Sequence, residues 1–258
     1  MKQTLHAEWT KLRTVTAPWW LLLATVVSTV AVSAATAAAA QCAPTGCHQD
    51  VVRLSLTGIQ LGQTVVVVLA VLMISGEYST GMMRTTLMAT PRRSTVLAAK
   101  AVVLTGVVLV AGAVAVLGCL LVAGLILPGN GFTTTQGHAL LSPADGPTLR
   151  AAAGSVLYLV LIALLGLGAA TAVRDSAAAV AVVLGLLFVL PILTQLVADP
   201  DRHRHLQQIA PMTAGLAVQA TVDLDALPVG PWAGLGVLAG WAVAALLGGV
   251  LALRLRDA

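Results

Sequence analysis

The sequence predicts an all-α integral membrane protein with six transmembrane helices, on three observations. Of its 258 residues, 58% are hydrophobic and only 9% are charged, whereas soluble domains contain roughly 45–50% apolar and about 25% charged residues. Several apolar runs exceed the roughly 18 residues that mark a membrane-spanning helix. These runs are apolar on every face and lack the alternation that is typical of barrel strands. A soluble enzyme and a lipid-facing β-barrel are therefore excluded.

Residues 1–17 precede the first apolar run and predict an interfacial helix. Its apolar stripe consists of Leu5, Trp9, Leu12 and Thr16. Its charged flank consists of Lys2, Glu8, Lys11 and Arg13. Such a helix lies flat at the headgroup boundary, and Pro18 with Trp19 and Trp20 marks the turn into the first span at the aromatic belt. The alternative, a basic leader that only sets orientation, explains the charge but not the stripe.

Six apolar runs are long enough to cross a bilayer, because a helix of about 22 residues rises roughly 33 Å. The predicted spans are residues 18–40, 54–75, 96–126, 151–173, 176–197 and 232–253, within a single transmembrane domain of residues 1–258. A cleaved signal peptide fits the first run less well. This run begins only at Pro18 and exceeds the roughly 7 to 15 apolar residues of a signal core.

The distribution of basic residues predicts that both termini are cytoplasmic. Six spans place the termini and the loops 76–95 and 174–175 on one side. That side carries ten basic residues: Lys2, Lys11, Arg13, Arg84, Arg92, Arg93, Lys100, Arg174, Arg254 and Arg256. The other side carries four: Arg53, Arg150, Arg202 and Arg204. Positive residues are retained in the cytoplasm, so we expect a multi-pass protein of the inner or plasma membrane. The basic excess is a topology signal, and we expect no nucleic-acid partner.

Polar groups inside the spans are mild. The middle of each predicted span lacks Asp, Glu, Lys, Arg and His, which disfavours a proton relay or an ion-coupled carrier. Gln60, Gln63 and Thr64 are candidate cargo-lining residues, although hydrogen bonding between helices is the alternative for each. Gly236, Gly240, Ala244 and Gly248 form a small-residue stripe along the last span, which predicts close helix packing within the subunit or across a dimer.

No motif for catalysis or metal binding is apparent. The spans contain no catalytic pair, and the chain has no GxxxxGK[ST] phosphate loop, so we expect no catalytic residue and ATP hydrolysis only on another chain. Cys42 and Cys47 lie five apart in the first outer loop, where a disulfide can form. A zinc site that includes His48 is the alternative, but it lacks a fourth ligand nearby, and we expect no metal.

The loop 76–95 has the pattern of a short docking helix. Ser79 or Thr80 can cap a helix in which Met83 and Leu87 share one face, and Pro91 can end it. Basic side chains follow at Arg92, Arg93 and Lys100. Two apolar side chains with a basic rim suit a groove on a cytoplasmic partner. A solvated basic loop explains the local pattern equally well.

Two segments carry a family resemblance. The leader Ala7–Arg13 with Trp19 and Trp20, and the segment Gly76–Leu87 with Pro91–Arg93 and Lys100, resemble the permease subunits of type-2 ATP-binding-cassette (ABC) transporters in the actinobacterial style. Together with the six-span layout, the resemblance covers essentially the whole chain. It implies that the leader is a connecting helix at the membrane surface. It also implies that the first cytoplasmic loop is a coupling helix that sits on an ABC ATPase, and that residues 198–231 form an outer re-entrant segment.

The resemblance further implies the functional residues and partners. The ATPase-coupling residues would be Glu77, Tyr78, Gly81, Met83, Arg84, Thr85, Leu87, Arg92 and Arg93, with Arg84 as the central basic group. We expect a permease subunit of an ATP-driven exporter for a hydrophobic or amphipathic cargo. Its partners would be an ABC ATPase, a second permease copy or close paralogue, and membrane lipid. The chain itself would bind no cofactor, since ATP and Mg²⁺ belong to the partner subunit. The alternative is a membrane scaffold or sensor that recruits a cytoplasmic protein without transport. A third possibility, an intramembrane enzyme, would need catalytic groups from its loops.

Overall fold

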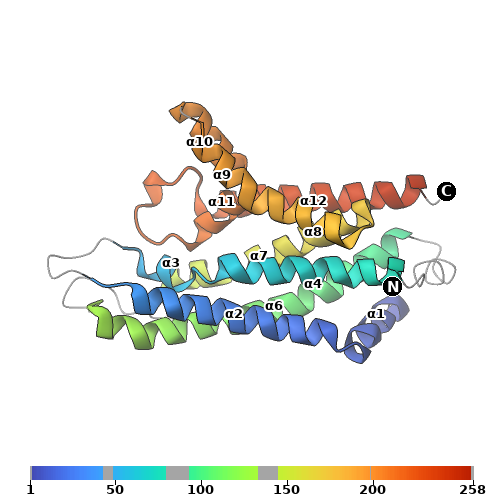
Figure 1. The fold of residues 1–258 in the computed structure, drawn as a ribbon, viewed down its shortest axis with the longest axis horizontal. Coiled ribbons are helices and arrows are strands. Elements are labelled where there is room, and N and C mark those ends of the chain that lie inside the picture. Colours follow the sequence, from blue (N-terminus) through green and yellow to red (C-terminus); the bar gives the residue numbers. More distant parts are fainter. Residues whose placement is uncertain (1, 43–48, 80–92, 133–144, 198, 257–258) are drawn as a thin grey trace.

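The computed structural model describes residues 2–42, 49–79, 93–132, 145–197 and 199–256, and within these ranges the chain forms helices and no strand. Six helical stretches of the described chain are long and apolar enough to cross a membrane. The prediction of an all-α membrane protein with six spans is therefore confirmed. The start of α1 and the end of α12 lie at the same end of the bundle (Figure 1). We call this the terminal end, and the opposite one the distal end.

The first half of the chain contains α1 (Lys2–Thr14), α2 (Ala17–Ala39), α3 (Val51–Ser55), α4 (Ile59–Ser79), α6 (Arg93–Ile126) and the short 3₁₀ helix η1 (Leu127–Asn130). The second half contains α7 (Gly146–Val173), α8 (Ser176–Leu184), η3 (Gly185–Val189), α9 (Leu190–Gln195), α10 (Pro200–Ile209), α11 (Pro211–Leu216), η4 (Ala217–Gln219), η5 (Leu224–Ala226) and α12 (Pro231–Arg256). The six spans correspond to α2, α4, α6, α7, the α8–α9 stretch and α12.

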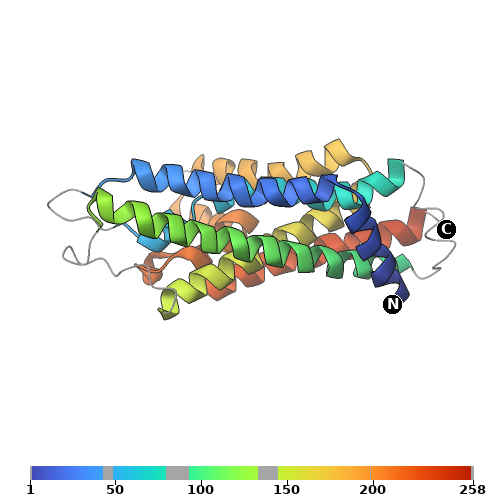
Figure 2. The same ribbon diagram turned by 90° about the horizontal axis from the view of Figure 1, so that it is seen from below.

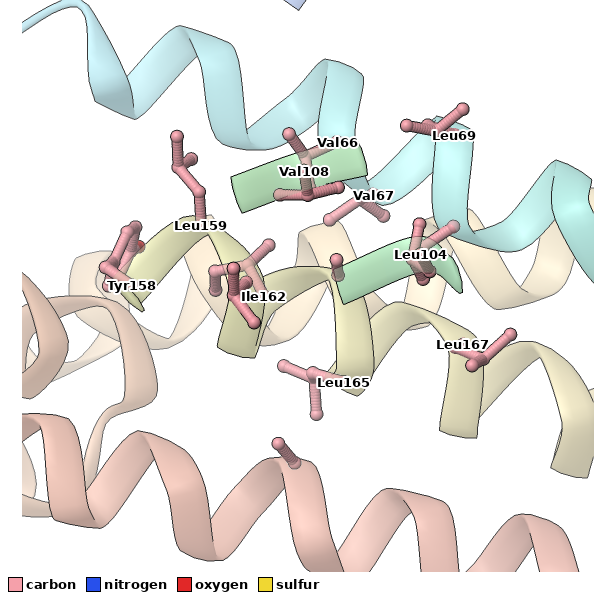
Figure 3. Packing of buried hydrophobic residues seen from close by; sticks show 14 of the residues in the cluster. Val66, Val67, Leu69, Leu104, Val108, Tyr158, Leu159, Ile162, Leu165 and Leu167 are labelled. Carbon is pink, nitrogen blue, oxygen red and sulfur yellow. The ribbon is translucent and has the colours of Figure 1, made fainter. Parts of the chain in front are cut away.

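Helix α7 is the centre of the bundle and packs against α4, α6, α8 and α12. Figure 3 shows the contact of α4, α6 and α7, which includes Val66, Val67, Leu104, Val108, Leu159 and Ile162. Because lipid tails are as apolar as these side chains, packing of this kind stabilises a membrane bundle through close van der Waals contact. At Gly168, an added Cβ would lie 2.5 Å from the backbone of Ala245 and Leu246. The glycine therefore lets α7 and α12 approach closely.

The small-residue stripe of the last span does not make this contact. Gly236, Gly240 and Gly248 face open space, and Ala244 is exposed as well. The glycine of α12 that packs against α7 is Gly249, where an added Cβ would lie 3.1 Å from the carbonyl oxygen of Gly168. Of the two alternatives for the stripe, packing within the subunit is wrong, because α7 lies against a different face of α12. Packing across a dimer stays a prediction.

The second span begins later and ends later than predicted. Residues 51–55 form the separate helix α3, and α4 begins at Ile59 because the chain turns where Gly58 packs against α2. A Cβ on Gly58 would lie 1.9 Å from the carbonyl oxygen of Thr29. At the other end α4 continues to Ser79, and the predicted short helix that Ser79 or Thr80 would cap lies outside the described residues. The predicted loop 76–95 therefore contributes residues 76–79 to α4 and 93–95 to α6, and residues 80–92 lie outside the described chain.

The fifth span is interrupted. Helix α8 begins at its cap Asp175, whose side chain accepts a hydrogen bond from the backbone N–H of Ala178. The α-helix then changes to the π-helical turn η3, which ends two residues before Pro191. Proline cannot donate a backbone hydrogen bond and interrupts the regular ladder at this point. Helices α9 and α10 then lead away from the bundle (Figure 1).

Helix α11 brings the chain back into the bundle. Ala210, Pro211 and residues 214–220 are buried, and α11 packs against α12. A Cβ on Gly215 would lie 2.7 Å from the ring of Tyr158, and a Cβ on Gly234 would lie 1.9 Å from the carbonyl oxygen of Ala214. The described part of the segment 198–231 thus contains the α-helices α10 and α11 and the 3₁₀ helices η4 and η5, and α11 packs between α7 and α12 at the distal end.

Candidate functional site

Four charged side chains from three helices meet at the terminal end of the bundle. The Lys100 ammonium lies 2.7 Å from Glu8 Oε2 and 2.8 Å from Glu77 Oε1. The Lys11 ammonium lies 3.0 Å from Glu8 Oε1 and 2.8 Å from the same oxygen of Glu77. Helix α1 supplies Glu8 and Lys11, α4 supplies Glu77, and α6 supplies Lys100. We call these four residues the charge cluster.

The local sequence of α1 explains its position. Figure 2 shows α1 running across the terminal end, at an angle to α2. Glu8 and Lys11 lie three apart, so they share a face of the helix. Leu12 is buried in the core on that side of α1. The indole N–H of Trp19 donates a hydrogen bond to the carbonyl oxygen of Leu12 at 3.1 Å, which fixes α1 against the first turn of α2.

The charge cluster is buried and electrically balanced. Lys100 is 1% exposed, Glu8 4% and Glu77 7%, and two carboxylates face two ammonium groups. Removing one partner from a buried pair leaves an uncompensated charge and costs about 3–5 kcal/mol. The cluster therefore holds α1, α4 and α6 in one arrangement, because no member can move alone without exposing or isolating a charge.

Lys11 is the most exposed member of the charge cluster. Burial alone lowers the pKa of its ammonium group, but hydrogen bonds to Glu77 and Glu8 and the negative charges of both carboxylates outweigh this effect. The pKa of Lys11 therefore lies above its ordinary value of 10.5, and the group is charged at neutral pH.

A cavity of about 400 Å³ opens beside the charge cluster. Its walls come from α1, the start of α2, the end of α4 and Lys100. They include Glu8, Lys11, Leu12, Val15, Pro18, Leu72, Met73 and Glu77. Glu77 lines this cavity, and its Oε2 atom is buried and has no hydrogen-bond partner. The cavity thus combines apolar walls with an unsatisfied carboxylate oxygen.

The predicted residues of the interfacial helix divide between two environments. Leu12 is buried and Leu5 packs against the core, whereas Trp9 and Arg13 are exposed and Lys11 is half-buried. Glu8, expected on the charged flank, is buried instead. The predicted apolar stripe is therefore split, because the ion pairs with Lys100 and Lys11 turn Glu8 toward the protein.

The predicted coupling residues are described only in part. Glu77 belongs to the charge cluster, Tyr78 lies in the last turn of α4, and Arg93 begins α6. The other predicted coupling residues lie outside the described residues: Gly81, Met83, Arg84, Thr85, Leu87 and Arg92. Their role in binding an ATPase stays a prediction.

The candidate cargo-lining residues of α4 lie in different surroundings. Gln63 is fully buried, Thr64 is half-buried and Gln60 is exposed. The Tyr158 hydroxyl of α7 donates a hydrogen bond to Gln63 Oε1, and Gln63 Nε2 lies 3.6 Å from the sulfur of Met212 in α11. Gln63 therefore joins α4 to α7 and α11, which is the alternative role of hydrogen bonding between helices.

At the distal end, Cys42 is disulfide-bonded, and its backbone N–H donates to the carbonyl oxygen of Asn130 at 3.0 Å. Its predicted partner Cys47 and the alternative zinc ligand His48 lie outside the described residues, so the pairing stays a prediction. In the described part of the chain, no three His, Cys, Asp or Glu side chains are grouped to hold a metal ion.

The sequence did carry a signal for the charge cluster. Glu8 lies in the leader, Glu77 follows the second predicted span, and Lys100 lies near the start of the third, all on the side to which the orientation rule assigns both termini. Opposite charges at the same depth of a membrane protein tend to pair. The cluster was not predicted, because Glu8 was assigned to the leader, Glu77 to the loop 76–95 and Lys100 to the basic side chains that follow it.

Comparison with known proteins agrees with this fold. The sequence model of a family described as "ABC-2 family transporter protein" matches residues 4–190, from α1 through the start of α9. No curated protein matches the chain significantly. The match covers well over half of the chain, including every member of the charge cluster. The protein therefore belongs to the ABC-2 transporter family, as a multi-pass permease component of an ABC transporter.

Proposed function

We propose that the protein is one of two permease subunits of an ATP-driven exporter and that the charge cluster transmits movement from a bound ABC ATPase to the spans. The observation that carries this proposal is the pair of contacts at Glu77. Its Oε1 atom lies 2.8 Å from both Lys11 and Lys100. Glu77 stands near the end of α4 and is the first residue of the coupling element, residues 77–87, that the family resemblance implies.

The segment 80–92 connects α4 to α6. An ATPase that pushes on this segment acts on the ends of both helices. Lys100 of α6 and Glu77 of α4 are paired, and both contact α1. Because breaking a buried pair is costly, the three helices move together, and α2 follows through the Trp19 hydrogen bond to Leu12. ATP-driven closure of the ATPases would thereby displace three spans as one unit.

The chemistry of the spans supports an amphipathic cargo. Exposed apolar side chains line the lipid-facing sides of α6, α8, α9 and α12, and the buried polar groups of the described spans away from the charge cluster are hydroxyls and amides. Such surfaces offer apolar contact with a few hydrogen-bonding groups. A lipid, peptide or antibiotic fits them better than a small ion.

The experiment separates ATPase binding from coupling. The full chain and its ABC ATPase are copurified, and the ATP hydrolysis rate of the complex is compared with that of the ATPase alone. We expect the permease to change the rate, and Lys100→Met to retain the bound ATPase while abolishing that change. The matched control is Arg202→Met at the distal end, where the exposed Arg202 pairs with Asp199 at 3.4 Å.

Two outcomes would overturn the proposal. If Lys100→Met folds and leaves the hydrolysis rate of the complex unchanged, the charge cluster has no part in coupling. If the wild-type chain recruits no ATPase, a membrane scaffold or sensor that binds another cytoplasmic protein becomes the better function. Circular dichroism and size-exclusion chromatography establish that each variant is folded.

A further inference from the structure

The cavity beside the charge cluster has the chemistry of a lipid-headgroup site. It encloses about 400 Å³ between α1, the start of α2 and the end of α4. Leu12, Val15, Leu72 and Met73 supply its apolar walls, whereas Glu77 and Lys11 supply charge at one side. Sites for small amphipathic ligands combine these two features: apolar walls that bury the ligand and a few polar groups that orient it.

The position of the cavity matches the boundary between lipid tails and headgroups. Trp19 and Trp20 are exposed at the start of α2, and exposed tryptophans mark this boundary in membrane proteins. Val15 and Leu72 line the cavity and are themselves exposed. A lipid molecule at this depth can therefore place its chains against Leu72 and Val15 and turn its headgroup toward Glu77.

Two polar groups in the cavity wall can each accept a further partner. Glu77 Oε1 receives both lysines, while Oε2 is buried without any hydrogen-bond partner. An unpaired buried carboxylate oxygen is costly, so this atom favours a ligand that donates a hydrogen bond. An ammonium group has three donors, and Lys11 uses two of them on Glu8 and Glu77. The third is open to an acceptor.

We propose that this cavity binds a zwitterionic phospholipid with a primary amine, a phosphoethanolamine lipid, as a site separate from the transport pathway. The lipid ammonium group donates to Glu77 Oε2, and the lipid phosphate accepts from Lys11. The four residues of the charge cluster carry no net charge, and a zwitterionic headgroup adds none. An anionic lipid such as phosphatidylglycerol donates only neutral hydroxyl hydrogen bonds to Glu77 and brings a negative charge beside this carboxylate without a compensating ammonium. A choline lipid carries the positive charge but has no N–H to donate.

The site is tested by measuring lipid binding to the purified full chain. The assay contains no ATPase, so its result does not depend on the proposed function. Native mass spectrometry measures the retention of dioleoyl phosphatidylethanolamine, its N-methyl and N,N-dimethyl derivatives, phosphatidylcholine and phosphatidylglycerol. We expect one phosphatidylethanolamine molecule to be retained at least about tenfold more strongly than phosphatidylcholine, equivalent to about 1.4 kcal/mol. The largest loss should come with the third methyl group, which removes the last N–H. Phosphatidylcholine binding within twofold of phosphatidylethanolamine, or tighter binding of phosphatidylglycerol, would overturn the proposal.

Two variants locate the site. Glu77→Gln replaces the charged carboxylate with a neutral amide, so the preference for phosphatidylethanolamine over phosphatidylcholine should fall. Leu72→Trp fills the cavity and leaves every charged residue in place, so phosphatidylethanolamine binding should fall at least about tenfold with unchanged thermal stability. The matched control is Leu121→Trp, at an exposed position of α6 that does not line the cavity, which should bind like wild type. If Leu72→Trp also binds phosphatidylethanolamine like wild type, the lipid does not occupy this cavity. This result decides the question whether or not Glu77→Gln folds.

Discussion

The Lys100 ammonium of α6 lies 2.7 Å from Glu8 Oε2 of α1, and solvent reaches almost none of either side chain. The contact joins residues 92 positions apart in the sequence. A lone ammonium or carboxylate at this depth would be several kcal/mol less stable than in water. Each side chain can therefore be buried only because the other compensates its charge. The angle of α1 across the bundle depends on both residues.

Lys100→Met should be strongly destabilising. The variant leaves Glu8 and Glu77 with Lys11 as the remaining cation of the charge cluster, and we expect a loss of about 3–5 kcal/mol in the free energy of unfolding. Thermal unfolding of the detergent-purified protein measures it. The double variant Lys100→Met/Glu8→Gln removes the excess charge and should recover part of the loss. Equal stability of the single and double variants would contradict a charge-based origin.

The contribution of Lys11 should disappear at alkaline pH. The pKa of Lys11 in the folded protein lies above its ordinary value of 10.5. A raised folded-state pKa means that the stabilisation is complete below the ordinary value and is lost as the pH rises through the folded-state value. Wild type should therefore unfold at a higher temperature than Lys11→Met at about pH 8, and the difference should shrink above about pH 10.5. A difference that is constant with pH would show that Lys11 acts through packing alone.

Tyr158→Phe tests whether Gln63 is structural. The variant leaves Gln63 Oε1 buried without the hydroxyl that donates to it, which costs about 1–3 kcal/mol. The double variant Tyr158→Phe/Gln63→Leu replaces both partners with apolar groups and should be more stable than the single one. Gln60→Leu, at an exposed position of the same helix, is the control and should be close to neutral. If transport changes while stability does not, cargo contact is the better role for Gln63.

Gly168→Ala should separate α7 from α12. Its Cβ would lie 2.5 Å from the backbone of Ala245 and Leu246, so the helices must move apart, and overpacking of this kind costs about 1–3 kcal/mol. Gly240→Ala is the matched control, because its Cβ would meet open space. Its folding stability should be unchanged or slightly raised, since alanine favours helices. If Gly240→Ala instead converts a dimer to a monomer in detergent, the exposed small-residue stripe is a contact between subunits.

The spans could be predicted because each depends on a local run of apolar residues. Their boundaries were less predictable where tertiary contacts decide them. Glu77 stays helical at the end of α4 because Lys11 and Lys100 compensate its charge, and Gly58 interrupts the second apolar run because the backbone of Thr29 lies against it. Neither partner lies nearby in the sequence.

Helical spacing alone could not assign the inward faces. Gln60 and Gln63 lie three apart, yet one is exposed and the other is buried against Tyr158. The small-residue stripe beginning at Gly236 has regular spacing, but Gly249 makes the contact with α7. In an apolar helix the hydrophobic pattern does not mark which side faces protein and which faces lipid, because both surroundings are apolar.

The most direct test of ATPase coupling is charge placed in the segment 80–92. Met83→Asp and Leu87→Asp put a carboxylate on the predicted apolar face, whose burial against a partner is worth roughly 1.5 to 3 kcal/mol per side chain. Arg84→Glu reverses the central basic group of the same segment. We expect less ATPase to copurify with each variant and cargo-dependent activity to fall with it. Membrane insertion should persist, because the predicted docking face lies outside the six spans.

The control for these three variants is Arg202→Glu, a charge reversal at the exposed distal surface of α10. It should leave ATPase binding unchanged, since the two ends of the bundle lie on opposite sides of the membrane in the predicted orientation. Pull-down of the tagged permease followed by quantification of the ATPase measures all four variants together. If the three loop variants retain the ATPase as fully as Arg202→Glu does, the segment 80–92 is a connector between α4 and α6. The contact with the ATPase must then be sought on another surface of the terminal end.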